Sequence, residues 1–370
     1  MFWYAIEKLF ELHIGLTLQQ IVLIGVLAQF SRLIFELPTS ILADRWNRRK
    51  ILLLSYFGFA LCALILGLSN GLGIYLFGTI IWGLASALGS GTYEAFTYDT
   101  LATNGLKEHF RKIYSRMFSI ELMTLSIASI IAGIMSHFFG LRVNFFITIL
   151  PMVFGMFMVL SMKEPDIIRT IHNDIDWIRH LSGSFRVIKG RHIRPVFTIF
   201  VFLAGFQTLW YEYYQLVGIS AKLPLVVYSA LLSIITLGVA AGSEVSYRIQ
   251  LSPRIITLAW SLLFVTQVIG LRLHTMVAVL ITITFVSISF GMLRVYLQVF
   301  LQHNIDSSRR ATILSLGTSM GYGIFIISGL LLTLMLSKFG ITWSITILAL
   351  PLIILGIIDI AKGMPWARTE

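Results

Sequence analysis

The sequence predicts an all-α protein that crosses a membrane many times, built from two related halves of six helices each. Three observations predict it: the composition, the length of the apolar runs, and the spacing of the basic residues. Of 370 residues, 57% are hydrophobic and only 12% are charged, whereas a soluble domain has about 25% charged residues. Most of the surface must therefore face lipid, and long Leu, Ile, Phe and Val runs without period-two alternation predict helices rather than a barrel.

The apolar runs predict eleven full membrane spans. A bilayer core is about 30 Å thick, so a helix needs about 20 apolar residues to cross it. The runs that are long enough lie near 18–43, 51–69, 73–100, 113–136, 142–161, 194–218, 224–247, 254–271, 275–302, 311–336 and 341–360. Residues 1–15 are apolar but too short, and we expect them to be the outer part of another helix whose first half is absent. An N-terminal helix lying at the membrane interface is the alternative.

The Lys and Arg residues predict the orientation of these spans. Every second break between runs is basic, beginning with Arg45, Arg48, Arg49 and Lys50, and the intervening breaks are nearly free of such charge. The positive-inside rule places the basic breaks in the cytoplasm, together with the C-terminus. Topology thus accounts for the formal net charge of +11 better than nucleic-acid binding does, and we expect no nucleic-acid partner.

One break is long and predicts a linker between the two halves. Residues 163–193 hold isoleucine, leucine and phenylalanine at steps of three and four between Ile171 and Ile188. This spacing places one apolar stripe on a helix, which would lie on the cytoplasmic membrane surface. The predicted organisation is an N-terminal half at 1–162, the linker at 163–193, and a C-terminal half at 194–370.

The two halves resemble each other in sequence. ITILP at 147–151 recurs as ITILALP at 345–351, and HFRKIYSRMFS at 109–119 has a counterpart in SRRATILSLGT at 308–318. Both offsets are close to 200 residues, and each segment holds the same place in its half. Two related six-helix halves are an architecture of secondary transporters, with the substrate site between them near the midplane.

The segment SILADRWNRR, residues 40–49, then resembles the loop motif of the major facilitator superfamily. That motif reads Gly-x-x-x-Asp-Arg-x-Gly-Arg-Arg/Lys and lies between the second and third helices. Asp44, Arg45, Arg48 and Arg49 match it in register, while Ser40 and Asn47 replace its two glycines. The resemblance extends over nearly the whole chain and implies the twelve-helix fold of that family, here with a shortened first helix.

The resemblance implies a cytoplasmic gate at this motif. In the family, ion pairs at this loop hold the outward-open state and break as the cytoplasmic side opens. Asp99, which ends the fourth helix on the same side, is the expected carboxylate partner of Arg45 or Arg48. The resemblance further implies a monomer in the cell membrane, surrounded by lipid, which moves a small-molecule substrate with protons as the candidate coupling ion.

Ionisable residues inside spans are costly and indicate functional sites. Arg32, Glu94, Glu121 and Arg294 are the main candidates for binding substrate or protons. Arg32 and Glu36 are four residues apart and can also satisfy each other, and Glu36 and Glu244 lie near cytoplasmic ends where they can reach water. A guanidinium as deep as that of Arg294 needs a carboxylate, water or an anionic substrate.

The seventh helix carries the aromatic segment GFQTLWYEYYQ at residues 205–215. We favour an aromatic belt at the outer membrane interface for this segment. The alternative is a cavity wall in which Trp210, Tyr211 and Tyr214 stack on a substrate and Glu212 supplies charge. Gln207 is a weaker candidate for the same wall.

These patterns predict a secondary transporter that moves a small solute by alternating access. Our first expectation is efflux of an amphipathic compound, and the alternatives are uptake of an anionic metabolite and a non-transporting membrane sensor or scaffold. Zinc-ligand spacing, a Walker loop and a dinucleotide fingerprint are absent, and Cys62 is the single cysteine. We therefore expect no enzyme activity, metal or cofactor.

Overall fold

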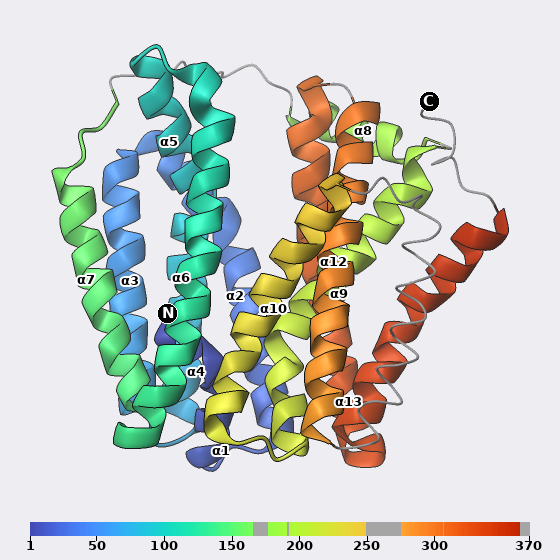
Figure 1. The fold of residues 1–370 in the computed structure, drawn as a ribbon. Helices are drawn as coiled ribbons and strands as arrows, with labels where there is room; N and C mark the ends of the chain where they lie inside the picture. Colours follow the sequence, from blue (N-terminus) through green and yellow to red (C-terminus); the bar gives the residue numbers. More distant parts are fainter. Residues whose placement is uncertain (166–176, 191, 249–274, 306, 363–370) are drawn as a thin grey trace. The chain divides into compact units, whose positions relative to one another are not determined.

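The fold is helical, as the computed structural model shows for residues 1–165, 177–190, 192–248, 275–305 and 307–362 (Figure 1). The first half of the chain forms η1 (Phe2–Ala5), α1 (Glu7–His13), α2 (Leu18–Arg45), α3 (Arg48–Leu68), α4 (Leu72–Gly89), α5 (Thr92–Thr103), η2 (Lys107–His109), α6 (Phe110–Phe139) and α7 (Val143–Ser161). The second half forms α8 (Trp177–Ile188), α9 (Ile193–Ser220), α10 (Leu225–Arg248), α12 (Met276–Asn304) and α13 (Ser307–Lys362).

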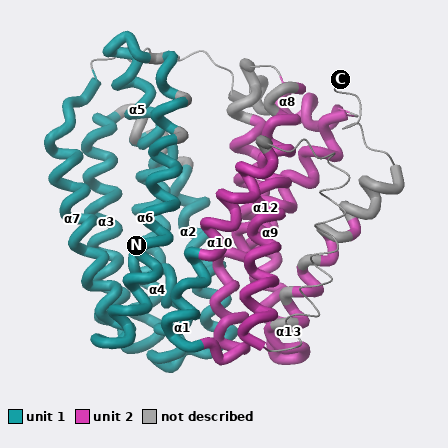
Figure 2. Tube along the Cα trace, in the orientation of Figure 1, with its two compact units in different colours: residues 1–171, 224–233 teal, residues 172–223, 234–370 magenta. Residues whose placement is uncertain are grey.

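These helices divide into two compact units (Figure 2). The first unit contains residues 1–171 and the start of α10, residues 224–233, and the second contains residues 172–223 and 234–370. The predicted linker at 163–193 includes α8, whose residues are assigned to the second unit.

The described residues include nine helices that are long and apolar enough to cross a membrane. These confirm a multi-pass helical protein. The predicted span at 254–271 lies outside the described residues. The predicted span at 341–360 lies in α13, which continues past Gly340 at a positive φ of 69°.

One predicted span is not a single helix. The run at 73–100 is interrupted between α4 and α5, where Gly91 adopts a left-handed conformation with φ of 70°. The apolar pattern continues across this point, so periodicity alone predicts no break. Glycine has no Cβ and takes this conformation without steric cost.

The N-terminal segment is packed inside the first unit. Trp3, Ile6 and Phe10 are at most 2% exposed. The ring of Trp3 stacks on Phe145 of α7 at 5.4 Å between centroids, and Phe10 lies 4.6 Å from the same ring. The alternative of a helix lying at the membrane interface is therefore wrong.

Capping residues explain why two of the long helices begin where they do. Thr17 and Gln20 form a capping box at the start of α2, each side chain accepting a hydrogen bond from the backbone of the other. Asn47 caps α3 by accepting from the backbone N–H of Lys50 at 3.3 Å. These side chains satisfy amide groups that a helix start leaves without an internal partner.

The internal repeat coincides with a shared structural detail. Pro151 lies inside α7 and Pro351 lies inside α13, and each ends one of the two matching sequence segments. In α7 one face is apolar and open, because Leu150, Phe154 and Phe157 are between 63% and 70% exposed. Such a face is suited to contact with lipid.

Candidate functional site

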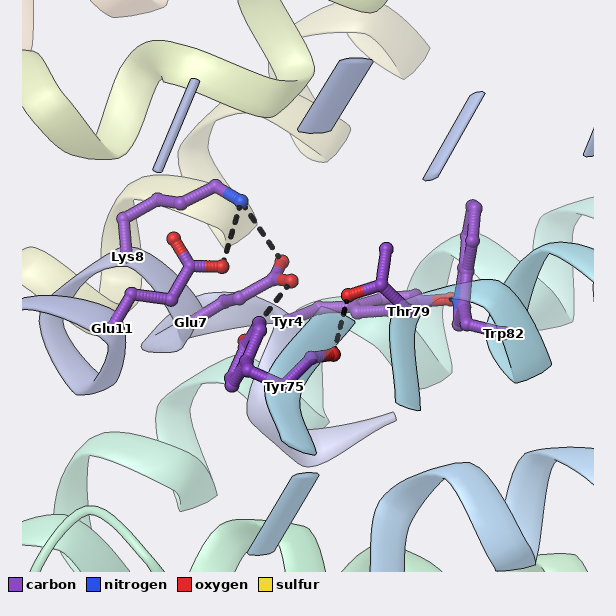
Figure 3. Close-up of polar contacts among 7 residues, drawn as sticks. All are labelled: Tyr4, Glu7, Lys8, Glu11, Tyr75, Thr79 and Trp82. Carbon is purple, nitrogen blue, oxygen red and sulfur yellow. Dashed lines mark hydrogen bonds and ion pairs between the residues drawn. The ribbon is translucent and has the colours of Figure 1, made fainter. Parts of the chain in front are cut away.

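Three charged residues of α1 form a buried cluster in the first unit, which we call the α1 charge cluster: Glu7, Lys8 and Glu11 (Figure 3). The Lys8 Nζ lies 3.3 Å from Glu11 Oε1 and 3.7 Å from Glu7 Oε2. The side chains of Lys8 and Glu11 are fully buried, whereas that of Glu7 is 16% exposed. Lysine is almost never fully buried unless it is paired.

Helical spacing explains how the cluster assembles. Residues three and four apart share a helix face, so Glu11 lies one turn from both Glu7 and Lys8. The neighbouring α4 supplies Tyr75, whose hydroxyl donates to Glu7 Oε1 at 3.5 Å. About two turns further along α4, the Trp82 indole N–H donates to the Tyr4 hydroxyl at 2.9 Å (Figure 3).

Sequence reasoning missed this cluster. Residues 1–15 are too short to span the membrane, so the sequence predicts no intramembrane charges there. The available signal was Glu7 and Glu11 at a spacing of four, with Lys8 between them, in an otherwise apolar run. Two carboxylates and one ammonium in a buried place can hold and release a cation or a proton.

A second polar cluster lies at the start of α3, which we call the α3 N-terminal cluster: Asn47, Arg48, Arg49, Asp99 and Glu164. The Arg48 guanidinium forms an ion pair with Asp99 of α5. The backbone N–H groups of Arg48 and Arg49 donate to the two oxygens of Glu164 at 2.9 Å each. A carboxylate at a helix N-terminus satisfies free amides and interacts favourably with the helix dipole.

The second motif arginine, Arg49, contacts α7 rather than Asp99. Arg49 donates from Nε to the Val159 carbonyl at 3.1 Å and from Nη2 to the Leu160 carbonyl, both at the end of α7. Glu164 was not among the predicted residues, because it follows α7 and has no sequence motif. The side chains of Ser40, Asp44 and Arg45 lie outside the part of the chain that is described, and their roles stay predictions.

Two carboxylates of the first unit, Glu36 of α2 and Glu94 of α5, lie near the join between α4 and α5. The Ser90 hydroxyl donates to Glu36 Oε1 at 3.4 Å, and the Tyr114 hydroxyl of α6 donates to Glu94 Oε1 at 3.2 Å. Glu121 of α6 lies within electrostatic range of Glu94. The structure thus brings Glu94 and Glu121 together on adjacent helices, while Arg32 of α2 acts electrostatically on Tyr4.

The second unit carries the predicted aromatic residues. Trp210 and Tyr214 are each 1% exposed and lie inside the protein, with α9 packed along α13 through the stacked rings of Tyr213 and Phe325. A belt at the membrane interface would leave these rings facing lipid, so the favoured belt interpretation is wrong for Trp210 and Tyr214. Among the described residues, no group accepts the Trp210 indole N–H.

The remaining candidates of this unit are more accessible. Tyr211, Glu212 and Gln207 are half-buried, and Arg294 of α12 is exposed. Arg294 is close enough to act electrostatically on the Tyr211 hydroxyl.

Within the described part of the chain, His, Cys, Asp and Glu side chains form no group of three that could hold a metal ion.

Comparisons with known proteins match this architecture. The family model of the Major Facilitator Superfamily matches residues 1–329. An uncharacterised MFS-type transporter, YxaM of Bacillus subtilis (strain 168), is 24% identical over 214 residues, which are 55% of this chain and 52% of that protein. The matched region thus spans about half the length of that relative.

Solved structures share the fold at low sequence identity. The nucleoside transporter NupG is 12% identical with a TM-score of 0.73, covering 97% of this chain and 93% of that one. A D-xylose-proton symporter is 12% identical with a TM-score of 0.74, covering 100% and 93%. A POT family transporter in complex with 5-aminolevulinic acid is 13% identical with a TM-score of 0.74, covering 99% and 95%.

Three observations indicate the same family: the internal sequence repeat, the loop motif at the start of α3, and the match of the family model to residues 1–329. The chain belongs to the major facilitator superfamily.

Proposed function

We propose that the protein is a proton-coupled secondary transporter that exports a small amphipathic compound by alternating access. Membership of the family supports secondary transport of a small solute, and the direction, solute and coupling ion are part of this proposal. The observation that supports the coupling is the cluster of three ionisable residues on α1, in which Lys8 and Glu11 are fully buried and Glu7 lies beside them. Such groups are retained inside membranes where ions or protons bind.

The buried aromatic residues of α9 support an amphipathic solute. Trp210 combines an apolar ring with an indole N–H that has no acceptor among the described residues. A ligand with a flat apolar body and one hydrogen-bond acceptor would satisfy both properties. Tyr211 and Glu212 follow on the same helix and add a hydroxyl and a charge.

The α3 N-terminal cluster is the proposed gate. Its Arg48–Asp99 ion pair joins α3 to α5 inside the first unit, and Glu164 ties the start of α3 to the end of α7. Ion pairs with two alternative arrangements suit an element that switches between states. Asp44 and Arg45 are proposed to belong to the same gate, on the resemblance to the family motif.

The proposal is tested by accumulation in cells that express the chain. The panel contains fluorescent amphipathic cations and labelled organic anions, and the variants are Asp44→Asn, Asp99→Asn and Glu94→Gln. We expect the wild type to lower the accumulation of at least one amphipathic compound, and both gate variants to lose this effect at unchanged membrane abundance. Glu94→Gln tests whether the Glu94 carboxylate, one of the predicted sites for substrate or protons, takes part in transport.

Three outcomes would contradict the proposal. Accumulation of organic anions alone would favour uptake of an anionic metabolite. Activity that tolerates Asp44→Asn and Asp99→Asn would remove the gate. Normal membrane abundance without any change in the panel would favour a sensor or scaffold.

A further inference from the structure

We propose that Arg294 and three neighbouring polar side chains bind the carboxylate of an amphipathic organic anion. We call this set the anion site, and it consists of Arg294 and Gln298 of α12 together with Gln207 and Tyr211 of α9. All four residues belong to the second unit. The inference rests on the proposed export of an amphipathic compound and deepens it, because it assigns that compound a charge and a functional group.

Arg294 lies inside a membrane span and is exposed there. The exposed apolar side chains of this span, Met276–Leu301, include Ile281 and Phe285 at 52% and 51%. Arg294 follows Phe285 by nine residues (294 minus 285), which is about 2.5 turns of an α-helix. The guanidinium is therefore exposed on the opposite side of α12 from its apolar outer stripe.

This side of α12 faces α9. Phe290 stacks on Phe206 of α9 with 5.8 Å between the ring centroids, and Arg294 shares the helix face of Phe290 because the two are four residues apart. Arg294 is also close enough to Tyr211 of α9 to act electrostatically on its hydroxyl. The two glutamines of the anion site lie one turn from Tyr211 and from Arg294, on the same two helices, and are half-buried.

The polar groups of the anion site are not used inside the protein. Within the described residues, none of its four side chains makes a hydrogen bond or an ion pair. Glu212, the acidic neighbour of Tyr211 in sequence, has its interaction elsewhere and is not paired with Arg294. Because a guanidinium within a membrane span needs a carboxylate, water or an anionic ligand, an entering anion would supply the partner that Arg294 lacks.

A long basic side chain can also extend to the membrane surface and keep its charge in water. The Cα–Cβ bond of a helical residue tilts toward the helix N-terminus, so Arg294 leans away from Asn304, the nearer end of α12. The ten residues to that end (304 minus 294) correspond to about 15 Å of helix. The direction of the side chain therefore favours a ligand inside the protein over the membrane surface.

The chemistry of the anion site selects a carboxylate on a flat apolar body. A guanidinium presents two parallel N–H groups that match the two oxygens of a carboxylate. The Tyr211 hydroxyl and the glutamine amides can donate to the remaining lone pairs. Trp210 and Tyr211 add aromatic surface on α9, which suits a planar apolar group.

Thermal unfolding of the purified full chain in detergent tests the proposal with two matched pairs of compounds. The pairs are 2-naphthoate with 2-naphthamide, and indole-3-acetate with indole-3-acetamide, so the apolar body is constant and only the charged group changes. Because a ligand that binds the folded state stabilises it, we expect both carboxylates to raise the melting temperature with increasing concentration and both amides to have little effect.

Two arginine variants make this result specific. We expect Arg294→Gln to weaken carboxylate binding by about tenfold or more, since it removes hydrogen bonds to a charged group. Arg194→Gln changes an exposed arginine at the start of α9 and should bind as the wild type does. Melting and circular dichroism without ligand establish that each variant is folded.

Two milder variants decide the matter if Arg294→Gln does not fold. Arg294→Lys keeps the charge but loses the planar fork, and Tyr211→Phe removes one donor, so each should bind the carboxylates more weakly than the wild type. The proposal would be overturned if carboxylates and amides stabilised the wild type equally or not at all, or if these variants bound the carboxylates unchanged. Stabilisation by 2-naphthyl phosphate alone would overturn it in favour of a phosphate site.

The binding result can be separated from the result on transport. A protein that binds the carboxylates through Arg294 but exports no compound would support the anion site and contradict the proposed export. A protein that exports only uncharged or cationic compounds, with unchanged export in Arg294→Gln, would support export and contradict the anion site.

Discussion

Lys8 is stable in its buried position because two carboxylates lie against its ammonium. Removing that ammonium takes away the cation that lies against both Glu7 and Glu11. We expect Lys8→Met to lower the free energy of unfolding by about 3–5 kcal/mol, the range for breaking a buried pair. Because both carboxylates can be neutralised by protons, the loss should be larger at alkaline than at acidic pH.

Thermal unfolding in detergent across pH measures this effect. The matched variant is Lys8→Met combined with Glu11→Gln, which removes one charge of each sign and should recover much of the stability. A single variant as stable as the wild type at every pH would show that the ion pairs do not stabilise the N-terminal segment.

Sequence reasoning at the residue scale succeeded where a motif existed. The motif arginines pointed to Asp99 as a partner, and the structure places Arg48 against it. It could not identify Glu164, because the contact is made by backbone amides. It placed Trp210 at the lipid interface because aromatic residues serve both belts and buried walls, and only packing distinguishes the two.

At the scale of elements, Gly91 controls the break between α4 and α5. Its φ of 70° is in the left-handed region, and a Cβ added there would meet no neighbouring atom within 4 Å. The cost of Gly91→Ala is therefore conformational, about 1–2 kcal/mol. We expect Gly91→Ala to lower the melting temperature and to weaken transport, because the join positions Ser90 and Glu94.

The matched variant is Gly91→Asn, since asparagine adopts this conformation more readily than alanine. It should retain more stability and activity than Gly91→Ala in the same assays. Equal effects of the two variants would mean that backbone conformation is not what this glycine supplies.

Glycines also permit close packing of α10 and α12 in the second unit. A Cβ added to Gly242 would overlap the carbonyl oxygen of Ile288, and one added to Gly291 would overlap that of Val239. Gly238 and Gly242 are four apart, the small-residue spacing typical of membrane helix pairs. We expect Gly242→Ala to cost about 1–3 kcal/mol through overpacking.

Gly323→Ala is the control for this prediction, because a Cβ there meets no atom within 4 Å. It should melt at the wild-type temperature or slightly above, measured in the same detergent. A Gly242→Ala protein that matches this control would show that α10 and α12 can separate without loss of stability.

At the scale of the whole molecule, the basic breaks predict the orientation in the membrane. Cys62 is the single cysteine of the chain and is buried. Replacing it in Cys62→Ala gives a cysteine-free background, in which one new cysteine at an exposed position can be labelled by itself. We expect a membrane-impermeant maleimide to reach Glu108→Cys from the cytoplasmic side and Pro224→Cys from the opposite side. Labelling of both from one side would contradict the predicted topology.

The fold could be predicted from sequence largely because hydrophobic length and basic spacing are one-dimensional signals. The spans, the repeat and the family are all carried by such patterns, and the division at 1–162, 163–193 and 194–370 stays a prediction. The α1 charge cluster could not be predicted in the same way. Its meaning depends on whether Glu7, Lys8 and Glu11 face water or protein, which only packing against α4 and α7 decides.

Transport by the purified protein in sealed proteoliposomes with an imposed pH gradient tests the central claim most directly. The same panel of fluorescent amphipathic compounds is followed with and without a proton ionophore, beside Asp99→Asn. We predict accumulation of at least one compound against its gradient, abolished by the ionophore and by the gate variant. The account would be contradicted if the ionophore left the accumulation unchanged. It would also be contradicted if the protein inserted into the liposomes but transported no compound of the panel.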